Sequence, residues 1–234
     1  MSQHHHHHNE EHFTGSQMVK DLVIGMSDGL TVPFALAAGL TGAITQTDII
    51  VTAGLAEIAA GSIAMGLGGY LAGKTEVEHY DAELKREYYE VDVYPEKERQ
   101  EVREVFEEYG LSKQSTELIV EELAKDKDKW VEFMMRFELG LEKPDINQAR
   151  KSALNIGLSY IAGGIVPLFP YFIASDVHVA LMYSCIVTGL CLFVFGYFKS
   201  KVIGQPPLYG ATRITIIGAL AAATAFFVAK LIGA

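Results

Sequence analysis

The chain has 234 residues, of which 50% are hydrophobic, and its formal net charge is −10. We expect no nucleic-acid partner for a chain this acidic, and two cysteines inside one apolar segment imply no disulfide framework. The charges are segregated: 14 of the 19 basic and 22 of the 29 acidic residues lie between Lys74 and Lys151. Such segregation indicates two environments, a hydrophobic part in lipid and a hydrated acidic insert.

Residues 1–18 are polar, so we expect no cleavable signal peptide there. Met1 to His8 includes five consecutive histidines, which favours a purification tag or its remnant. A natural histidine-rich tail that collects metal is the alternative. We expect these residues to form a cytosolic N-terminal tail.

The first two apolar segments, Val23 to Ile44 and Ile49 to Leu71, each contain a single charged residue. These are Asp28 and Glu57, and each segment has the length needed to cross a hydrocarbon core of about 30 Å. An ionisable group at membrane depth usually marks an ion or proton route, although one near the surface could merely snorkel or cap a helix. Residues 19–74 are therefore predicted to hold transmembrane helices 1 and 2.

Met65 follows Glu57 by eight residues, just over two helical turns, so both side chains can lie on one face of the second helix. The methionine thioether is a soft ligand, which would suit a metal path. A lone methionine in a membrane helix is more often filler, and the spacing alone does not decide between the two.

The acidic insert, residues 75–151, is predicted to form amphipathic helices. The first, about 75–90, continues the second membrane helix, and a break at Val91 to Pro95 precedes helices near 96–109, 115–124 and 129–141. Glu87 and Glu90 are three residues apart, as are Glu98 and Glu101, so each pair lies on one helix face. Met134 and Met135 precede Glu138 by four and three residues, so these three side chains can converge. The candidate metal ligands are Glu87, Glu90, Glu98, Glu101, Met134, Met135 and Glu138.

Carboxylates beside thioethers favour borderline-soft divalent ions over calcium or magnesium. The alternative is that the acidic faces are only solvated, as charged helical faces usually are.

Three apolar spans follow the insert, at 153–174, 177–198 and 208–229, and residues 152–234 are predicted to hold transmembrane helices 3 to 5. Cys185 and Cys191 lie in the second of these spans, where packing is favoured over metal binding. The predicted fold is an all-α membrane protein with five transmembrane helices and a three-helix-type cytosolic metal-binding domain between helices 2 and 3. The short loops near Thr45 and Ser175 lack Lys and Arg, which places the N-terminus and insert in the cytosol and the C-terminus across the membrane.

Three runs closely resemble the vacuolar iron transporter family, particularly its plant members. They are Ser27 to Leu40 (SDGLTVPFALAAGL), Ala56 to Leu71 (AEIAAGSIAMGLGGYL) and Phe133 to Pro144 (FMMRFELGLEKP). The resemblance extends from about His12 onward. It implies a multi-pass homodimer in the vacuolar membrane that exchanges cytosolic Fe(II) for vacuolar protons. It further implies a translocation path through Asp28 and Met65 with Glu57 nearby, and the seven insert residues above as a cytosolic metal site. Gln17 departs from the plant pattern, which tends to have Glu there.

The expected partners are a second copy, the bilayer, divalent metal ions and protons, with no permanent cofactor. Fe(II) is the expected cargo, with Zn(II), Co(II) or Mn(II) as surrogates, and a manganese transporter of the same family is the nearest alternative. Two rival functions are a membrane-anchored iron sensor and a ferritin-like ferroxidase. The insert's single histidine, His79, forms no Glu-x-x-His pair, which argues against a ferroxidase and for a protein that is not an enzyme.

Overall fold

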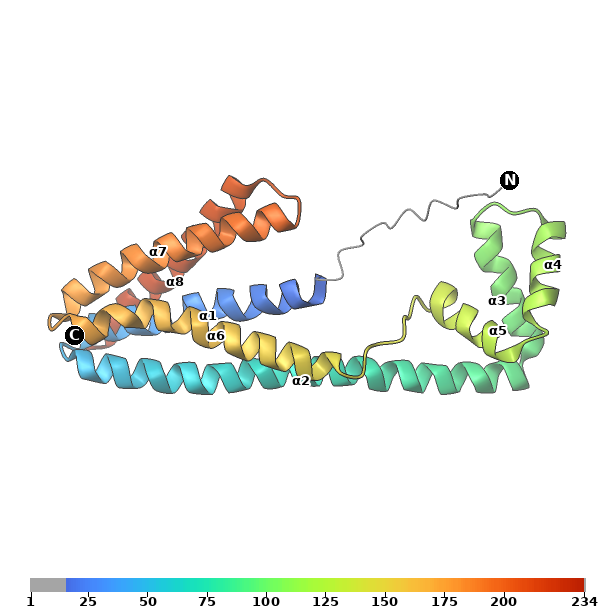
Figure 1. Ribbon diagram of the computed structural model, residues 1–234, viewed down its shortest axis with the longest axis horizontal. Coiled ribbons are helices and arrows are strands. Elements are labelled where there is room, and N and C mark those ends of the chain that lie inside the picture. Colours follow the sequence, from blue (N-terminus) through green and yellow to red (C-terminus); the bar gives the residue numbers. More distant parts are fainter. Residues whose placement is uncertain (1–15, 234) are drawn as a thin grey trace, which may run out of the picture. The chain divides into compact units, whose positions relative to one another are not determined.

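The computed structural model describes residues 16–233, and every regular element in that range is a helix. The histidine run predicted to be a tag lies outside the described residues. The described chain divides into two compact units, which are considered separately: the membrane unit comprises 16–70 and 150–233, and the insert unit comprises Leu71–Ala149. Five helices are long and apolar enough to cross a membrane, as predicted. They are α1 (Ser16–Ala43), α2 (Thr47–Val93), α6 (Gln148–Ile173), α7 (Val177–Val202) and α8 (Pro207–Gly233) (Figure 1).

Helix α2 is a single unbroken helix of 47 residues (Figure 1). At about 1.5 Å per residue it is roughly 70 Å long, more than twice the thickness of a hydrocarbon core. Only its first half is apolar, and the part from Leu71 onward belongs to the insert unit. The predicted continuity between the second membrane helix and the first insert helix is therefore observed.

Glycines let α1 and α6 approach closely in the membrane unit. A Cβ added at Gly29 would overlap the Tyr160 carbonyl group, and one at Gly163 would lie 2.9 Å from the Leu30 backbone nitrogen. Small residues at such crossings allow membrane helices to gain backbone contact, since lipid supplies no hydrophobic drive for their association. Further along the same pair, Thr41 Oγ1 and the Tyr171 hydroxyl form a buried hydrogen bond of 2.9 Å.

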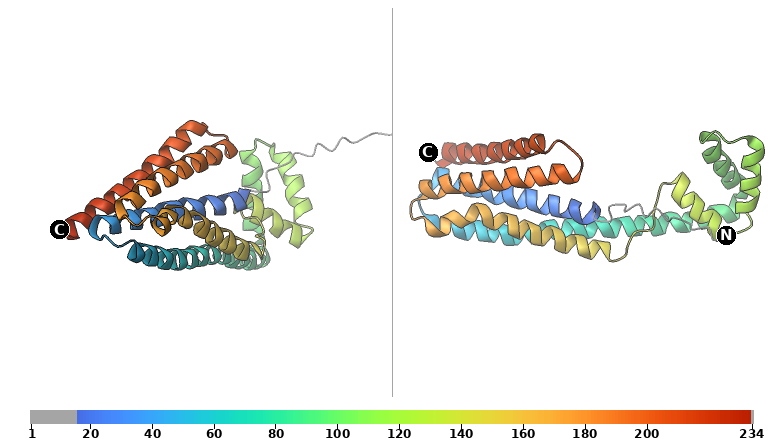
Figure 2. Two further views of the ribbon diagram at one scale, coloured as in Figure 1. Left: turned by 60° about the vertical axis from the view of Figure 1, so that its left-hand side comes forward. Right: turned by 45° about the horizontal axis from the view of Figure 1, so that its top comes forward.

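Helices α7 and α8 lie side by side, connected by a short turn in which Gly204 has a φ of 72° (Figure 2). Asp176 caps the start of α7 by accepting hydrogen bonds from the backbone N–H groups of His178 and Val179, both at 2.9 Å. Pro207 begins α8, where its missing N–H costs nothing. Both helices also contact α1, so the three form one packed group.

The insert unit has its own hydrophobic core. It contains the end of α2, α3 (Pro95–Glu108), α4 (Lys113–Leu123), α5 (Lys127–Phe133) and the π-helix η1 (Met134–Glu138). The core residues are Val91, Val102, Val120, Trp130, Val131, Met134 and Met135. Ser112 caps α4 and Asp126 caps α5, each by accepting from a backbone N–H three residues later, so local polar residues define where these short helices start.

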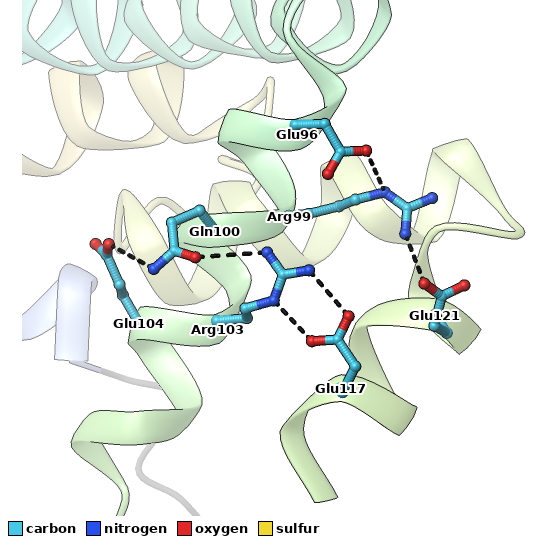
Figure 3. A network of polar contacts seen from close by, with 7 residues as sticks. All are labelled: Glu96, Arg99, Gln100, Arg103, Glu104, Glu117 and Glu121. Carbon is cyan, nitrogen blue, oxygen red and sulfur yellow. Dashed lines mark hydrogen bonds and ion pairs between the residues drawn. The ribbon is translucent and has the colours of Figure 1, made fainter. Parts of the chain in front are cut away.

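Ion pairs connect α3 and α4 on the surface of the insert unit (Figure 3). Arg103 donates through Nε and Nη2 to the two oxygens of Glu117, at 2.8 and 3.0 Å. Arg99 Nη1 donates to Glu121 Oε1 at 3.1 Å. The bidentate geometry of Arg103 and Glu117 orients the two helices more strictly than a single contact would.

Several predicted boundaries differ from the structure. Helix α2 ends at Val93 rather than Glu90, and the break consists of Tyr94 alone, with Pro95 at the first position of α3. The last insert helix begins at Lys127 rather than Lys129, and its end is a π-helix that stops at Glu138 rather than Leu141. Gly140 has a φ of 64°, a conformation that terminates the helix and that glycine adopts without strain.

Candidate functional site

Five of the predicted ligands converge in the insert unit. Glu87 and Glu90 come from the last turns of α2, Glu98 and Glu101 from the first turns of α3, and Glu138 from η1. Oxygens of Glu87, Glu90 and Glu98 lie within 4.8 Å of one another, and so do oxygens of Glu98, Glu101 and Glu138. We call these the first and the second carboxylate group. Glu98 belongs to both, so the two groups adjoin at its side chain.

Two of these carboxylates are removed from water. The Glu98 residue is 0% exposed and Glu87 is 1% exposed. Neither Glu98 oxygen has a hydrogen-bond donor, and Glu87 Oε2 has none either, among the residues that the structure describes. Burying an ionised carboxylate without a donor is costly, and a cation held between the oxygens would remove that cost.

The surroundings raise the pKa values of these groups. Burial, followed by the charges of Glu101 and Glu87, raises the pKa of Glu98 from 4.5 to about 7. Burial, followed by the charges of Glu138 and Glu90, raises the pKa of Glu87 to about 7. The pKa of Glu138 is also raised, first by burial and then by Glu101. Protons therefore compete with any bound cation near neutral pH.

Two basic side chains flank the carboxylate groups. Lys97 Nζ lies 2.7 Å from Glu101 Oε1 and 3.7 Å from Glu98 Oε1, in the second group. Arg86 Nε lies 3.7 Å from Glu90 Oε1, in the first group, while Arg86 Nη2 lies 3.0 Å from Glu83 Oε2. These cations compensate part of the negative charge of the groups.

Met134 and Met135 are buried in the core of the insert unit, at 0% and 2% exposure. They are the first two residues of η1, the element that ends with Glu138. In that π-helix, Leu139 N–H bonds to the Met134 carbonyl, a five-residue spacing. Single π-turns often occur at functional sites, because the wider turn re-aims side chains. That the thioethers bind metal together with Glu138 stays a prediction.

In the membrane unit, Asp28 lines a cavity of about 550 Å³ between α1, α7 and α8. The same cavity is lined by Lys199, near the end of α7, and by Arg213, in the second turn of α8. Tyr209 and Gln205 add further polar groups. A carboxylate that shares a cavity with two basic residues can pair with one of them or with a bound cation.

Glu57 lies on α2 and is contacted by α6. The buried Tyr160 hydroxyl donates to Glu57 Oε1, whereas Glu57 Oε2 is buried without a donor among the described residues. The Tyr160 backbone packs against Gly29, the neighbour of Asp28. Tyr160 therefore connects the surroundings of the two predicted path carboxylates, while Met65, on the same helix as Glu57, is partly exposed.

Sequence reasoning missed Tyr160 and also Asp21. Asp21 is 1% exposed and accepts hydrogen bonds from Gln17 Nε2 at 3.2 Å and Asn155 Nδ2 at 3.3 Å. Because an amide can donate and a carboxylate cannot, Gln17 can hold Asp21 in a way that a glutamate could not. The signal for Asp21 was its place just before the first apolar segment, but Tyr160 in an apolar helix gave no such signal.

Known proteins with similar sequences cover nearly the whole chain. The profile of the VIT family matches residues 19–230. Vacuolar iron transporter 1 of Arabidopsis thaliana is 49% identical over 223 residues, which is 95% of this chain and 89% of that protein. Vacuolar iron transporter 1 of Oryza sativa subsp. japonica is 50% identical, covering 94% and 88%. Protein CCC1 of Saccharomyces cerevisiae is 38% identical, covering 93% and 70%.

Proposed function

Because the chain belongs to the VIT family, we propose that it is a proton-coupled antiporter that moves Fe(II) and similar divalent transition metal ions from the cytosol into the vacuole. The observation that carries this proposal is the pairing of two features in one chain. Carboxylates lie within the apolar spans at Asp28 and Glu57, and five glutamates converge in the insert unit. The first feature suits an ion path, and the second suits capture of the cargo.

In this proposal the insert unit captures ions on the cytosolic side. Oxygens of the two carboxylate groups supply hard ligands, and Met134 and Met135 supply soft ligands that favour Fe(II), Co(II) or Zn(II) over magnesium. Because the pKa values of Glu87 and Glu98 are about 7, a bound ion replaces protons at near-neutral pH. Capture is therefore reversible, as delivery to a transport path requires.

Asp28 is the proposed shared site for metal and proton within the membrane unit. A carboxylate in a low-dielectric path favours its neutral form unless a cation takes the place of the proton, so the two compete for the same oxygens. Facing a cytosol near neutral pH, Asp28 binds the ion. Facing an acidic vacuole, it takes up a proton and releases the ion.

The proposed assembly is a homodimer, in which two copies of Asp28 and Met65 supply two hard and two soft ligands. The proposed orientation places the N-terminus and the insert unit in the cytosol and the C-terminus in the vacuole. Its support is the charge distribution, since Lys20, Lys199 and Lys201 lie on the same predicted side as the 14 basic residues of the insert.

The test measures metal-dependent proton flux in proteoliposomes with an imposed pH gradient. Asp28→Asn keeps the size of the side chain but cannot exchange a proton, so coupled Fe(II) transport should be abolished while folding is retained. Asp48→Asn is the control, because Asp48 is an exposed residue in the first turn of α2. Fe(II) transport by Asp28→Asn at the wild-type rate would refute the role of Asp28 and make Glu57 the leading candidate.

A further inference from the structure

The second carboxylate group already contains a cation supplied by the protein itself. Lys97, the residue before Glu98 on α3, has its ammonium nitrogen 2.7 Å from Glu101 Oε1 and 3.7 Å from Glu98 Oε1. These two residues are two of the three members of the group. The lysine side chain is 61% exposed and Glu98 is fully buried, so the ammonium approaches the group from the solvent side.

The first carboxylate group has a different relation to its basic neighbour. Among the ion pairs of the described residues, Arg86 contacts one member of this group, Glu90, with Nε at 3.7 Å, and its Nη2 lies 3.0 Å from Glu83, which belongs to neither group. The guanidinium is thus anchored outside the group, whereas the Lys97 ammonium contacts two members of the second group directly. The two groups, although they share Glu98, therefore differ in how accessible their oxygens are to an added ion.

We propose that Lys97 is an internal counter-ion that a divalent cation must displace from the second carboxylate group, so that this group fills after the first and at a higher metal concentration. The inference rests on the proposed capture of metal ions by the insert unit. A divalent transition metal binds carboxylate oxygens at about 2.0–2.2 Å, and a dication at that distance repels an ammonium group held by the same carboxylates. Lysine is suited to the exchange, since its flexible stem lets the charge move into water.

The need to displace the Lys97 ammonium group also makes the second carboxylate group selective among divalent metal ions. An incoming ion must bind the three oxygens more strongly than the ammonium binds two of them. Magnesium gives up its water reluctantly, whereas Mn(II), Fe(II) and Co(II) exchange water for protein ligands more readily. Lys97 should therefore suppress magnesium occupancy of the second group more than transition metal occupancy.

The experiment titrates the full chain in detergent with Mn(II), counting bound ions by the loss of the free-ion electron paramagnetic resonance signal. Mn(II) is chosen because its affinity for imidazole is the lowest of the Irving–Williams series, which limits binding to His4–His8. The variants are Lys97→Gln, which removes the charge, and Lys97→Arg, which retains it. The control is Lys74→Gln, because Lys74 forms a similar exposed i,i+4 pair with Glu78 at 3.4 Å outside both groups.

The two carboxylate groups of the wild-type protein should fill in two separate steps. Lys97→Gln should lower the dissociation constant of the weaker step by about fivefold at low ionic strength, the factor expected for one exposed ion pair, and leave the tighter step nearly unchanged. The difference should shrink in about 0.5 M salt, because the competing charge is screened. Lys97→Arg and Lys74→Gln should behave like wild type.

Equal or weaker binding at the second step in Lys97→Gln would overturn the inference, because a merely structural lysine gives no gain in affinity when it is removed. Glu98→Gln distinguishes this failure from a failure of the proposed capture function. If Glu98→Gln removes both steps while Lys97→Gln changes neither, capture stands and the role of Lys97 is rejected. If Glu98→Gln binds like wild type, the capture function and the inference both fail.

Discussion

The position of Glu98 is unfavourable for an ionised side chain when no metal ion is bound. Its carboxylate belongs to both groups, yet it is fully buried and neither oxygen has a hydrogen-bond donor among the described residues. Because its pKa is raised to about 7, the side chain in the folded protein is mostly protonated below about pH 7. The stability that this residue contributes is complete below its ordinary pKa of 4.5 and is lost as the pH rises through 7.

Replacing Glu98 by Gln should therefore affect metal-free stability in a pH-dependent way. At about pH 5 the two proteins should unfold alike, and at about pH 8 Glu98→Gln should be more stable by roughly 1–3 kcal/mol, because a buried charge without a donor is gone. Thermal unfolding in detergent with a chelator measures both values. Glu104→Gln, on the exposed face of α3, is the control. An equal gain at both pH values would contradict the assignment of the shift to ionisation of Glu98.

Tyr160→Phe tests the contact between α6 and Glu57. The change keeps the ring that packs against Gly61 but removes the hydroxyl that donates to Glu57, so the buried carboxylate loses its donor. We expect Fe(II) transport to fall by about tenfold, the factor for one hydrogen bond to a charged group. Tyr171→Phe is a matched control, because Tyr171 is also buried in α6 but bonds to the neutral Thr41. Proteoliposome flux should separate the two variants, and equal loss in both would indicate a packing effect only.

At the scale of elements, the crossing of α1 and α6 in the membrane unit depends on close backbone approach. The α1 and α6 backbones meet at Gly25, Gly29 and Gly163. Within the same contact lie Asp28 on one helix and Tyr160 on the other. A change of spacing between these helices should therefore disturb both path carboxylates at once.

Gly29→Ala should destabilise the membrane unit by about 1–3 kcal/mol, because the added Cβ would overlap the Tyr160 carbonyl group and neither backbone can yield freely. Gly189→Ala in α7 is the control, because a Cβ at that position has no heavy atom within 4 Å and alanine is the better helix former. Thermal unfolding in detergent compares the two. A Gly29→Ala protein as stable as Gly189→Ala would show that α1 and α6 are not in such close contact.

At the scale of the whole molecule, the sequence consists of two apolar spans, one charged insert and three further apolar spans. In the proposed orientation, the five spanning helices place the two ends of the chain on opposite sides of the membrane. The same proposal places the insert on the side of the N-terminus, because the insert follows the second predicted span. The basic residues are the reason that the proposal assigns this side to the cytosol.

Membrane-impermeant thiol labelling checks this orientation. In a background with Cys185 and Cys191 replaced by Ala, a cysteine at Thr45 or Ser175 should label only from the vacuolar side, and a cysteine at Lys113 only from the cytosolic side. Both native cysteines are free thiols on α7, so their removal breaks no disulfide. Intact vacuoles and inverted vesicles provide the two accessible faces. Labelling of Lys113→Cys from the vacuolar side would overturn the proposed orientation.

The sequence by itself determined the five spans, the acidic insert, and the candidate residues Asp28 and Glu57. These follow from hydropathy and charge, which act over one helix and do not depend on its neighbours. The helix ends near Tyr94 and Gly140 were predicted to within a few residues, because Pro95 and Pro144 cannot continue a preceding helix. The π-helix was missed, since no residue type specifies one.

Only the tertiary structure decided which side chains meet. The spacing of glutamates showed that pairs share a helix face, but it could not show that α2, α3 and η1 converge on Glu98 or that Glu98 is buried without a donor. Lys97 beside Glu98 and Tyr160 against Glu57 were equally invisible, because both contacts depend on side-chain direction or on residues far apart in the chain. The physical reason is that burial and the distances between charges are properties of packed helices, and they set how strongly a carboxylate holds a proton or a metal ion.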